Sequence, residues 1–217
     1  MNSIIITKDN SPTLYVHELN EHYHSTNGAL QESLHIFINA GLKEIKKDKI
    51  SILEVGFGTG LNALLTFQEI QNSNKTIYYE TIEKYPINKD IVQNLHKEEI
   101  FNSELFLELH KAIWEEDVTI SNNFVLKKLN IDLKKYITQQ KFDLIYFDAF
   151  SPDKQPNLWT EKIFLKLYNA TNKNGILVTY SAKGIVKQAL RNAGYIVKRL
   201  PGPKGKRHMI KATKENK

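Results

Sequence analysis

The chain has 217 residues, 41% of them hydrophobic and 25% charged, which is ordinary for a globular protein with one sizeable α/β core. It contains no cysteine and no apolar run near the roughly 20 residues of a membrane span, which excludes disulfides, thiolate metal sites and a membrane helix. The net charge is +6. Residues 183–217 hold eleven Lys or Arg and one Glu, so this part carries +10 and the preceding 182 residues carry −4. The asymmetry favours a polyanionic partner such as nucleic acid, with a solvated lysine-rich surface as the alternative.

The N-terminal part predicts two short strands, SIIIT (3–7) and TLYVHEL (13–19), joined by a turn at KDNSP. A helix is expected at ALQESLHIFINAGL (29–42), where apolar residues recur at helical spacing and Gly41 is a suitable end. The first residues lack the charged start and long apolar stretch of a signal peptide. We therefore expect a cytoplasmic location.

From residue 49 onward, strand patterns alternate with helix patterns, which is typical of a parallel sheet covered by helices on both faces. The last two strands, joined at PGPKGKR, form an antiparallel hairpin at one edge. The predicted fold is a doubly wound, mostly parallel, seven-stranded Rossmann-like sheet with one antiparallel edge strand and a short N-terminal β/α extension. The expected strands are 49–55, 76–83, 124–130, 142–148, 176–181, 195–200 and 208–213, and the helices 61–70, 87–96, 132–137, 157–171 and 182–194, with helical tendency around 103–115.

A glycine loop, LEVGFGTGLN (53–62), follows the first core strand and enters a helix. Gly56, Gly58 and Gly60 permit a tight turn and close approach of the backbone to a ligand. The spacing G-x-G-x-G differs from the G-x-G-x-x-G of dinucleotide enzymes, and the Glu54 carboxylate would repel a pyrophosphate. The loop therefore favours S-adenosylmethionine, whose methionine end carries an ammonium and a sulfonium; a glycine turn without a ligand is the alternative.

Two further acids support this interpretation. Glu83 ends the next strand, 23 residues after Gly60, where such folds place a carboxylate that accepts hydrogen bonds from a ribose diol. Glu80, three residues earlier, competes for this role. Asp132 is expected to meet the adenine edge, to cap the short helix predicted at 132–137, or to do both.

Six motifs run in order along the chain: YHSTNGALQES (23–33), LEVGFGTGLN (53–62), TIEKYP (81–86), FDAFSPDKQPNLWT (147–160), TYSAKGIVKQALRNAG (179–194) and KRHM (206–209). Together they resemble the bacterial tRNA methyltransferases that complete 5-methylaminomethyl-uridine at the wobble position, which form the N-terminal part of bifunctional MnmC proteins. The DAFSP…NLWT run together with KRxM is the most specific part. The family's usual KREM reads KRHM here, with His208.

The resemblance implies N-methylation, by S-adenosylmethionine, of the 5-aminomethyl group of uridine 34 in tRNA, giving 5-methylaminomethyl-uridine or its 2-thio form. We expect one methyltransferase domain over 1–217. Residues 1–45 would cover the cofactor, and 46–217 would form the Rossmann-like core with its basic C-terminal hairpin. No flavin-dependent oxidase domain follows residue 217, so we expect a stand-alone enzyme whose substrate other enzymes supply.

The glycine loop and the acids, together with the N-terminal motif that the resemblance places over the cofactor, give a set of expected cofactor-binding residues; without the resemblance, the N-terminal motif would be a surface loop and helix. These are Tyr23, Ser25, Glu32, Glu54, Gly56, Phe57, Gly58, Thr59, Gly60, Asn62, Glu83, Lys84, Asp132 and Asp148. The tRNA, contacted around its anticodon stem-loop, is expected to meet Phe150, Pro152, Lys183, Lys204, Lys206 and Arg207. Phe150 would stack on a flipped-out uracil, with a core position as the alternative. His22, His24 and His35 form no convincing metal set, and the transfer needs no metal.

Asp148 ends an apolar strand expected beside the glycine-loop strand, and the resemblance implies that it is the catalytic residue. Its acceptor would be an alkyl ammonium with a pKa near ~10, which an ordinary aspartate with a pKa of ~4 deprotonates poorly. Either water takes the proton before binding or a dry site draws the two pKa values together. We favour a positioning role for Asp148 over general-base catalysis.

Several alternatives share this fold. Another class I methyltransferase would act on RNA or on a small amine. An aminopropyltransferase would use decarboxylated S-adenosylmethionine on polyamines, which the +10 C-terminal part would repel. An inactive RNA-binding module would have no need of the intact glycine loop, Glu83 and Asp148. A dinucleotide dehydrogenase ranks last.

Overall fold

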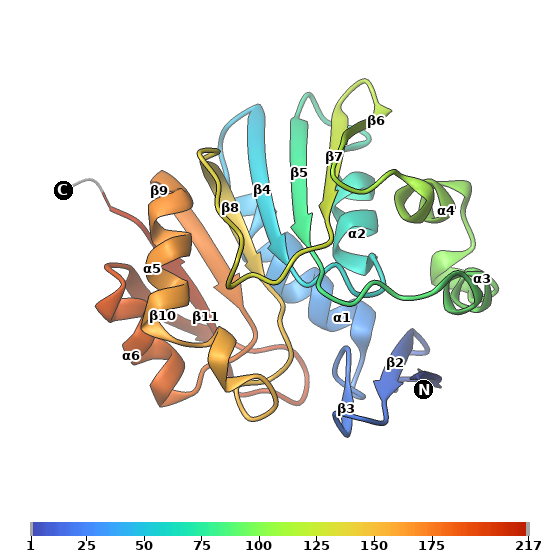
Figure 1. The fold of residues 1–217 in the computed structure, drawn as a ribbon, viewed down its shortest axis with the longest axis horizontal. Helices are drawn as coiled ribbons and strands as arrows, with labels where there is room; N and C mark the ends of the chain where they lie inside the picture. The colour runs from blue at the N-terminus through green and yellow to red at the C-terminus, as the bar shows by residue number, and fades with distance from the viewer. Residues whose placement is uncertain (1, 216–217) are drawn as a thin grey trace.

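The computed structural model describes residues 2–215, and it places an eight-stranded sheet at the centre of the molecule (Figure 1). Residues 1, 216 and 217, at the ends of the domain expected over 1–217, lie outside the described residues. The strand order is β10-β11-β9-β8-β4-β5-β7-β6. These strands are β4 (Lys49–Val55), β5 (Thr76–Ile82), β6 (Asp117–Ser121), β7 (Phe124–Leu129), β8 (Phe142–Phe147), β9 (Thr171–Thr179), β10 (Ile196–Pro201) and β11 (His208–Thr213).

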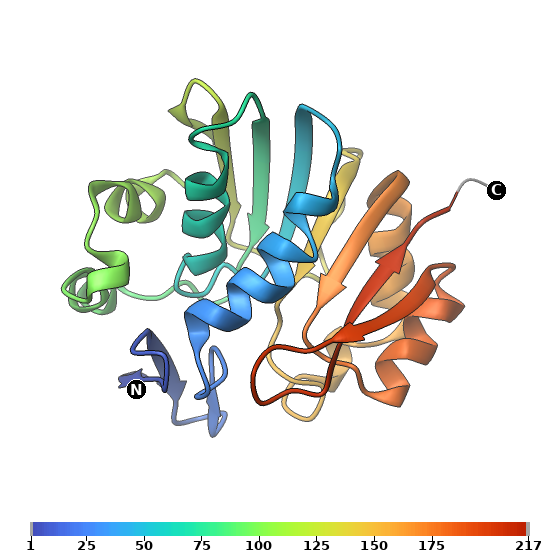
Figure 2. The same ribbon diagram turned by 180° about the vertical axis from the view of Figure 1, so that it is seen from behind.

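Helices cover both faces of this sheet: α5 and α6 lie on one face, and α1 and α2 cross the other (Figures 1 and 2). The helices are α1 (Ala29–Ser33), α2 (Leu61–Ile70), α3 (Lys89–His96), α4 (Glu104–Lys111), α5 (Glu161–Ala170) and α6 (Gly184–Asn192). Shorter helical segments are η1 (Leu34–Asn39), a π-helical continuation of α1, and η2 (Leu42–Glu44), η3 (Glu99–Phe101) and η4 (Pro156–Leu158). No helix within residues 2–215 is long and apolar enough to cross a membrane.

The central strands are parallel and end at one edge of the sheet. β4 pairs in parallel with β5 and β8, and Val55 lies beside both Ile82 and Phe147 at the strand ends. β8 is buried at all its positions because a parallel sheet is covered on both faces. Alternate residues of β4 pack into the two core layers, Ile52 on the α2 side and Leu53 on the α5 side. The loops that follow these strands therefore meet at the carboxyl edge.

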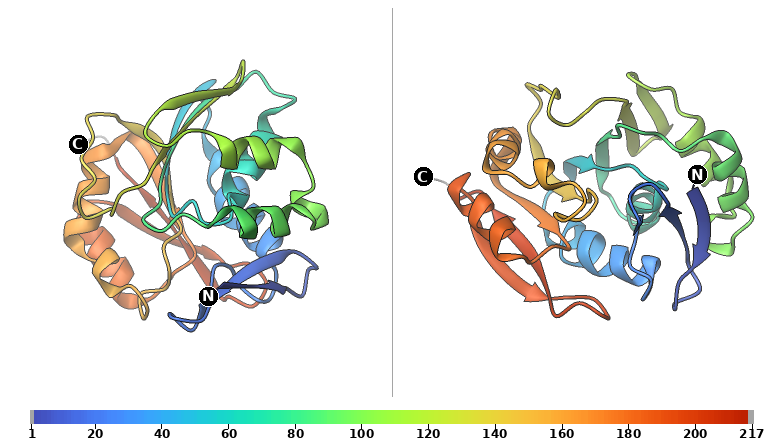
Figure 3. Two further views of the ribbon diagram at one scale, coloured as in Figure 1. Left: turned by 45° about the vertical axis from the view of Figure 1, so that its right-hand side comes forward. Right: turned by 60° about the horizontal axis from the view of Figure 1, so that its bottom comes forward.

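A small antiparallel sheet of β1 (Asn2–Ile6), β2 (Pro12–Val16) and β3 (Glu21–His22) lies at this carboxyl edge, toward which β4 and β5 point (Figures 1 and 3). The first two strands and the turn between them confirm the expected N-terminal extension. The extension also reaches the C-terminal hairpin, since Nε2 of His35 lies 2.9 Å from the carbonyl oxygen of Pro201.

The α/β, mostly parallel fold is confirmed, with two corrections to the sheet. It has eight strands, because β6 adds a short antiparallel strand beyond β7; the alternation of Val118 and Ile120 with polar residues was a strand signal that the prediction overlooked. The reversed strand is β11, and it lies between β9 and β10 rather than at the edge. Burial explains the order, since Met209 and Ile210 of β11 are fully buried while Ile196 of β10 is half exposed.

Three helix predictions also need correction. The short helix expected at 132–137 is only a turn, because a segment this short gains too little from helical hydrogen bonds. α5 begins at Glu161, capped by the Thr160 side chain, so Trp159 precedes the helix and is buried. α3 begins after Asn88, whose side chain accepts a hydrogen bond from the backbone, rather than at Pro86.

Candidate active site at the carboxyl edge of the sheet

A cleft of about 360 Å³ opens where β4, β5, β7 and β8 end, within the ~300–1,000 Å³ typical of small-molecule sites. The glycine loop, the segment after β5, residues 131–134, the loop after β8 and the N-terminal extension form its walls. The expected cofactor residues that line it are Tyr23, Gly56, Phe57, Gly58, Thr59, Asn62, Glu83, Lys84, Asp132 and Asp148. Ser25, Glu32, Glu54 and Gly60 do not line it.

The glycine loop packs closely against three residues of the cleft wall, namely Tyr23, Glu83 and Asp148. The backbone N–H of Gly58 donates a hydrogen bond to Oε2 of Glu83 over 3.1 Å. With φ at 53°, a Cβ at Gly58 would lie only 2.9 Å from Cδ1 of Tyr23. At Gly56, a Cβ would lie 2.7 Å from the carbonyl oxygen of Asp148. Both positions therefore require glycine.

Glu54 lies beneath the loop, 0% exposed, instead of in the cleft wall. Its Oε2 accepts a hydrogen bond from Oγ1 of Thr81 at 2.8 Å, while Oε1 has no partner within residues 2–215. Burial, with a smaller contribution from Asp148, raises the pKa of Glu54 to about 8. The side chain is therefore mostly protonated at neutral pH, unlike the ionised carboxylate that the sequence suggested, and a bound cation would favour its ionisation.

This raised pKa has a consequence for stability. In the unfolded chain the pKa of Glu54 is near its ordinary value of 4.5, so the folded state holds an extra proton between pH 4.5 and about 8, and stability falls as pH rises through that window. We expect Glu54→Gln to gain stability relative to wild type across this window, by at most about 1.4 kcal/mol per pH unit. Thermal unfolding at several pH values measures the difference. A constant difference, equal to that of the exposed control Glu99→Gln, would contradict it.

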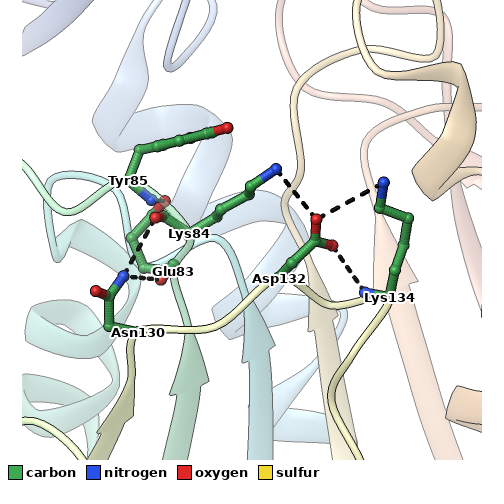
Figure 4. Close-up of polar contacts among 6 residues, drawn as sticks. All are labelled: Glu83, Lys84, Tyr85, Asn130, Asp132 and Lys134. Carbon is green, nitrogen blue, oxygen red and sulfur yellow. Dashed lines mark hydrogen bonds and ion pairs between the residues drawn. The ribbon is translucent and has the colours of Figure 1, made fainter.

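At the other end of the cleft, Glu83 is fixed by the backbone around it (Figure 4). Its Oε1 accepts a hydrogen bond from the backbone N–H of Tyr85 at 2.8 Å, and burial raises the pKa of Glu83. Asn130, which the sequence analysis missed, donates from Nδ2 to the carbonyl oxygens of Glu83 and Lys84 over 2.9 and 3.2 Å. This asparagine ties the end of β7 to the segment after β5. Its position directly after a strand was the available signal.

Asp132 faces this segment with two lysines beside it (Figure 4). Its Oδ2 lies 3.1 Å from Nζ of Lys84 and 3.7 Å from Nζ of Lys134. Burial acts to raise the pKa of Asp132, but the backbone hydrogen bond from Lys134 and the Lys84 ammonium together lower it. Asp132 is thus an ionised acceptor in the cleft, and it caps a turn rather than a helix.

Asp148 is the first residue after β8, and its backbone lies against Gly56 of the glycine loop. Its backbone N–H donates to the carbonyl oxygen of Val55 at 3.0 Å, and its Oδ2 accepts from Nδ2 of Asn62 at 2.9 Å. Burial, with the nearby Glu32 carboxylate, raises the pKa of Asp148 to about 7. This side chain therefore exchanges protons near neutral pH, as perturbed carboxyls in functional sites do.

Comparison with known proteins decides the family. Residues 89–215 match the sequence profile of a family described as S-adenosyl-L-methionine-dependent methyltransferase. The chain belongs to this family. It is 30% identical to the bifunctional protein MnmC of Campylobacter hominis, named for tRNA 5-methylaminomethyl-2-thiouridine biosynthesis, over 92% of this chain and 31% of that protein. The chain spans about a third of the length of the curated relatives it matches.

A solved structure agrees with this assignment. MnmC2 from Aquifex aeolicus matches with a TM-score of 0.79 and 26% identity, covering 100% of this chain and 71% of that chain. Spermidine synthase from Thermotoga maritima shares the fold alone, with a TM-score of 0.63 and 15% identity over 98% of this chain and 69% of that chain. The expected fold, resemblance and use of S-adenosylmethionine are thereby confirmed.

The residues of the methyltransferase fit this cofactor. Buried acceptors without a partner carry a free-energy cost that a donor group of a ligand can relieve. Oδ1 of Asn62 is such an acceptor within residues 2–215, and its side chain lines the cleft; Oε1 of Glu54, buried beneath the loop, also has no partner there. Asn62 suits the cationic methionine end, while the Glu83 carboxylate at the far side suits sugar hydroxyls.

Glu32 and Lys206, expected on the cofactor and on RNA respectively, form an ion pair with each other. Oε2 of Glu32 also accepts a hydrogen bond from the backbone N–H of Ser25 at 2.8 Å. Nζ of Lys206 lies 4.1 Å from the ring centroid of Tyr180, whose hydroxyl donates to the carbonyl oxygen of Ala149 at 2.8 Å. This cluster borders Asp148 and links the extension to the C-terminal hairpin. Tyr180, an aromatic residue directly after β9, was not among the residues expected from the sequence.

The other residues expected to contact RNA differ in their exposure and partners. Lys204 and Arg207 are exposed at the turn between β10 and β11, while Lys183 is ion-paired with Asp153. Pro152 is buried. Phe150 is half-buried in the cleft wall, with its ring 5.1 Å from that of Tyr23. Among residues 2–215, no group of three or more His, Asp or Glu side chains is arranged to hold a metal ion.

Proposed function

We propose that this protein methylates the nitrogen of the 5-aminomethyl group of uridine 34 in tRNA, giving 5-methylaminomethyl-uridine or its 2-thio form. The main support is an aspartate with a raised pKa, Asp148, at the end of an S-adenosylmethionine cleft, in a chain similar to MnmC. Because the aminomethyl group must be present first, a separate activity that installs it would act earlier. The reaction would take place in the cytoplasm, with the tRNA.

We assign the cofactor to the glycine loop and the two acids beyond it. Asn62 would hold the methionine end, with Glu54 buried beneath it and ionising when the cation binds, Glu83 would hold the ribose hydroxyls and Asp132 the adenine edge. Tyr23, whose ring lies directly over Gly58, would cover the bound molecule and exclude water. S-adenosylmethionine, when bound, supplies a methyl group on a sulfonium that an uncharged amine attacks.

Asp148 would hold the acceptor amine and also take its proton, a base role that its raised pKa makes more favourable than the positioning role expected from the sequence. The pKa of about 7 narrows the gap to an alkyl ammonium from about six units to about three. A dry pocket lowers the pKa of the ammonium as well, which narrows the gap further. The hydrogen bond from Asn62 leaves Oδ1 of Asp148 free to face the amine. Phe150, beside it in the cleft wall, would stack on the uracil.

The exposed cations at the β10–β11 turn would contact the phosphates of the anticodon stem-loop. We expect Lys204→Ala combined with Arg207→Ala to weaken tRNA binding and to lower the slope of log Kd against log salt by about two units. Filter binding between low and moderate salt measures the slope. Lys173→Ala, an exposed cation at the amino end of β9, is the matched control. An unchanged slope in the double variant would place the tRNA on another surface.

A panel of acceptors tests the proposed substrate. Purified protein is incubated with S-adenosylmethionine labelled in the methyl group and with tRNA carrying 5-aminomethyl-uridine, unmodified tRNA or putrescine. We expect label only in the aminomethyl tRNA. Label in putrescine would indicate a small-amine methyltransferase, and label in unmodified tRNA another RNA position; either result would overturn the assignment.

A further inference from the structure

A second cavity, of about 570 Å³, lies behind the glycine loop between α3, α4 and the end of β7. Figure 1 and the left view of Figure 3 show these two helices beside β7. Its wall is largely apolar, with Val92 from α3, Leu107 from α4 and Trp114 beyond α4. Phe57 of the glycine loop belongs to the wall of both cavities and separates this cavity from the cofactor cleft.

A buried lysine reaches this cavity. Lys128 ends the inward-facing row of β7 and is 1% exposed, yet it lines the cavity. Its Nζ donates one hydrogen bond, over 2.7 Å, to the carbonyl oxygen of His110, and it lies 4.7 and 5.4 Å from the ring centroids of Trp114 and Phe57. An ammonium has three donors, so this one retains donors for another acceptor.

No acid in the described part of the chain compensates the charge of Lys128. Within residues 2–215 Lys128 forms no ion pair, and burial alone lowers its pKa to about 8, so it remains mostly charged at neutral pH. Buried ammonium groups are normally paired or hydrogen-bonded because leaving water is costly. Lys89 and Lys111 add positive charge to the cavity wall. The cavity thus combines apolar walls with an unpaired cation.

We propose that this second cavity binds a small organic anion, whose carboxylate or phosphate pairs with Lys128 and whose apolar or aromatic part packs on Trp114, Leu107 and Val92. Anionic acceptors form strong, short hydrogen bonds with ammonium groups, and the two aromatic rings suit a flat body. The ligand would sit beside the glycine loop, because Nε2 of His110 lies 3.1 Å from the carbonyl oxygen of Thr59. Binding of an anion in this second cavity does not depend on which molecule accepts the methyl group.

Tryptophan fluorescence gives a local readout. The chain has two tryptophans, and Trp159→Phe leaves Trp114, in the cavity wall, as the only one. Phenyl phosphate and benzoate serve as probes, and benzyl alcohol is the neutral control. We expect both anions to change the Trp114 emission saturably. Benzyl alcohol should bind at least about tenfold more weakly than either anion, or show no binding. Adding Lys128→Met should weaken the binding of both anions by a similar factor. The exposed control Lys97→Met should leave their affinities unchanged.

Three outcomes would overturn this site: no saturable change with either anion, equal affinity for benzyl alcohol, or full displacement of the anions by S-adenosylhomocysteine, which would place them in the cofactor cleft. Binding of S-adenosylhomocysteine by Lys128→Met verifies that the variant is folded. If that variant does not fold, the anions can still be compared with benzyl alcohol in the Trp159→Phe protein, which keeps Lys128. That comparison tests the site without any change at this lysine.

Discussion

Asp148→Asn is expected to lower kcat for methyl transfer by about 10²–10⁴-fold, the usual contribution of a positioned proton acceptor. The asparagine keeps the shape of the side chain and can still bond to Asn62, but it has no negative charge to hold an ammonium and cannot take its proton. Calorimetric titration should find the Kd for S-adenosylmethionine changed by no more than about threefold, because the substitution acts on the acceptor side. Nucleoside analysis under single-turnover conditions measures the chemical step.

The pH dependence separates this role from a structural one. Protonation of Asp148 below its pKa of about 7 removes the charge that holds the amine, so kcat/KM of wild type should fall as pH decreases through about 7. Asp148→Asn should lose this inflection. Asp153→Asn, an exposed carboxyl in the same loop, is the matched control and should keep both rate and profile. If Asp148→Asn retains the wild-type rate, the proposed catalytic role is wrong.

Gly58→Arg should abolish cofactor binding. The backbone at this position has a positive φ of 53°, and a Cβ would approach the Tyr23 ring to 2.9 Å. Strain and overpacking of this kind typically cost about 1–3 kcal/mol each, and the long side chain would also fill the cleft. We therefore expect the Kd for S-adenosylmethionine to rise about 100-fold or more, since each 1.4 kcal/mol is tenfold.

The matched control is Gly184→Arg, because nothing lies within 4 Å of a Cβ at that glycine. Binding of S-adenosylmethionine should be unchanged there. tRNA binding by Gly58→Arg should remain near wild type, because the basic turn of Lys204 and Arg207 belongs to another element. Loss of tRNA binding together with the cofactor would show that the two sites are not separable.

Local patterns predicted most of the framework. β4, β5 and β8 follow apolar runs that end at glycine or acid, and α2 follows a helical pattern between Gly60 and Gln71, so their bounds agree within a residue. β6 was overlooked although Val118 and Ile120 alternate with polar residues as in a half-buried strand; its register comes from β7. The position of β11 depends on which hairpin strand is more apolar, which short strands indicate only weakly.

The parts of the site that could not be predicted from the sequence are those that tertiary contacts create. Glu32 and Lys206 are 174 residues apart, and only the hairpin and the extension bring them together. The protonated state of Glu54 depends on complete burial, which the loop motif does not reveal. Lys128 did leave a signal: Phe124, Leu126 and Lys128 alternate along β7, so the strand period places this lysine on the buried side.

Methylation of an aminomethyl group on tRNA, at the glycine-loop cleft and with Asp148 as proton acceptor, is the activity that we propose. It is tested most directly by weighing the nucleosides of tRNA carrying 5-aminomethyl-uridine at position 34, after incubation with S-adenosylmethionine and either wild-type or Asp148→Asn protein. We predict one added methyl group on that nucleoside with wild type and almost none with the variant, although both bind the cofactor. No added methyl with wild type, despite bound cofactor, would contradict the proposed substrate, and equal methylation by the variant would contradict the role of Asp148.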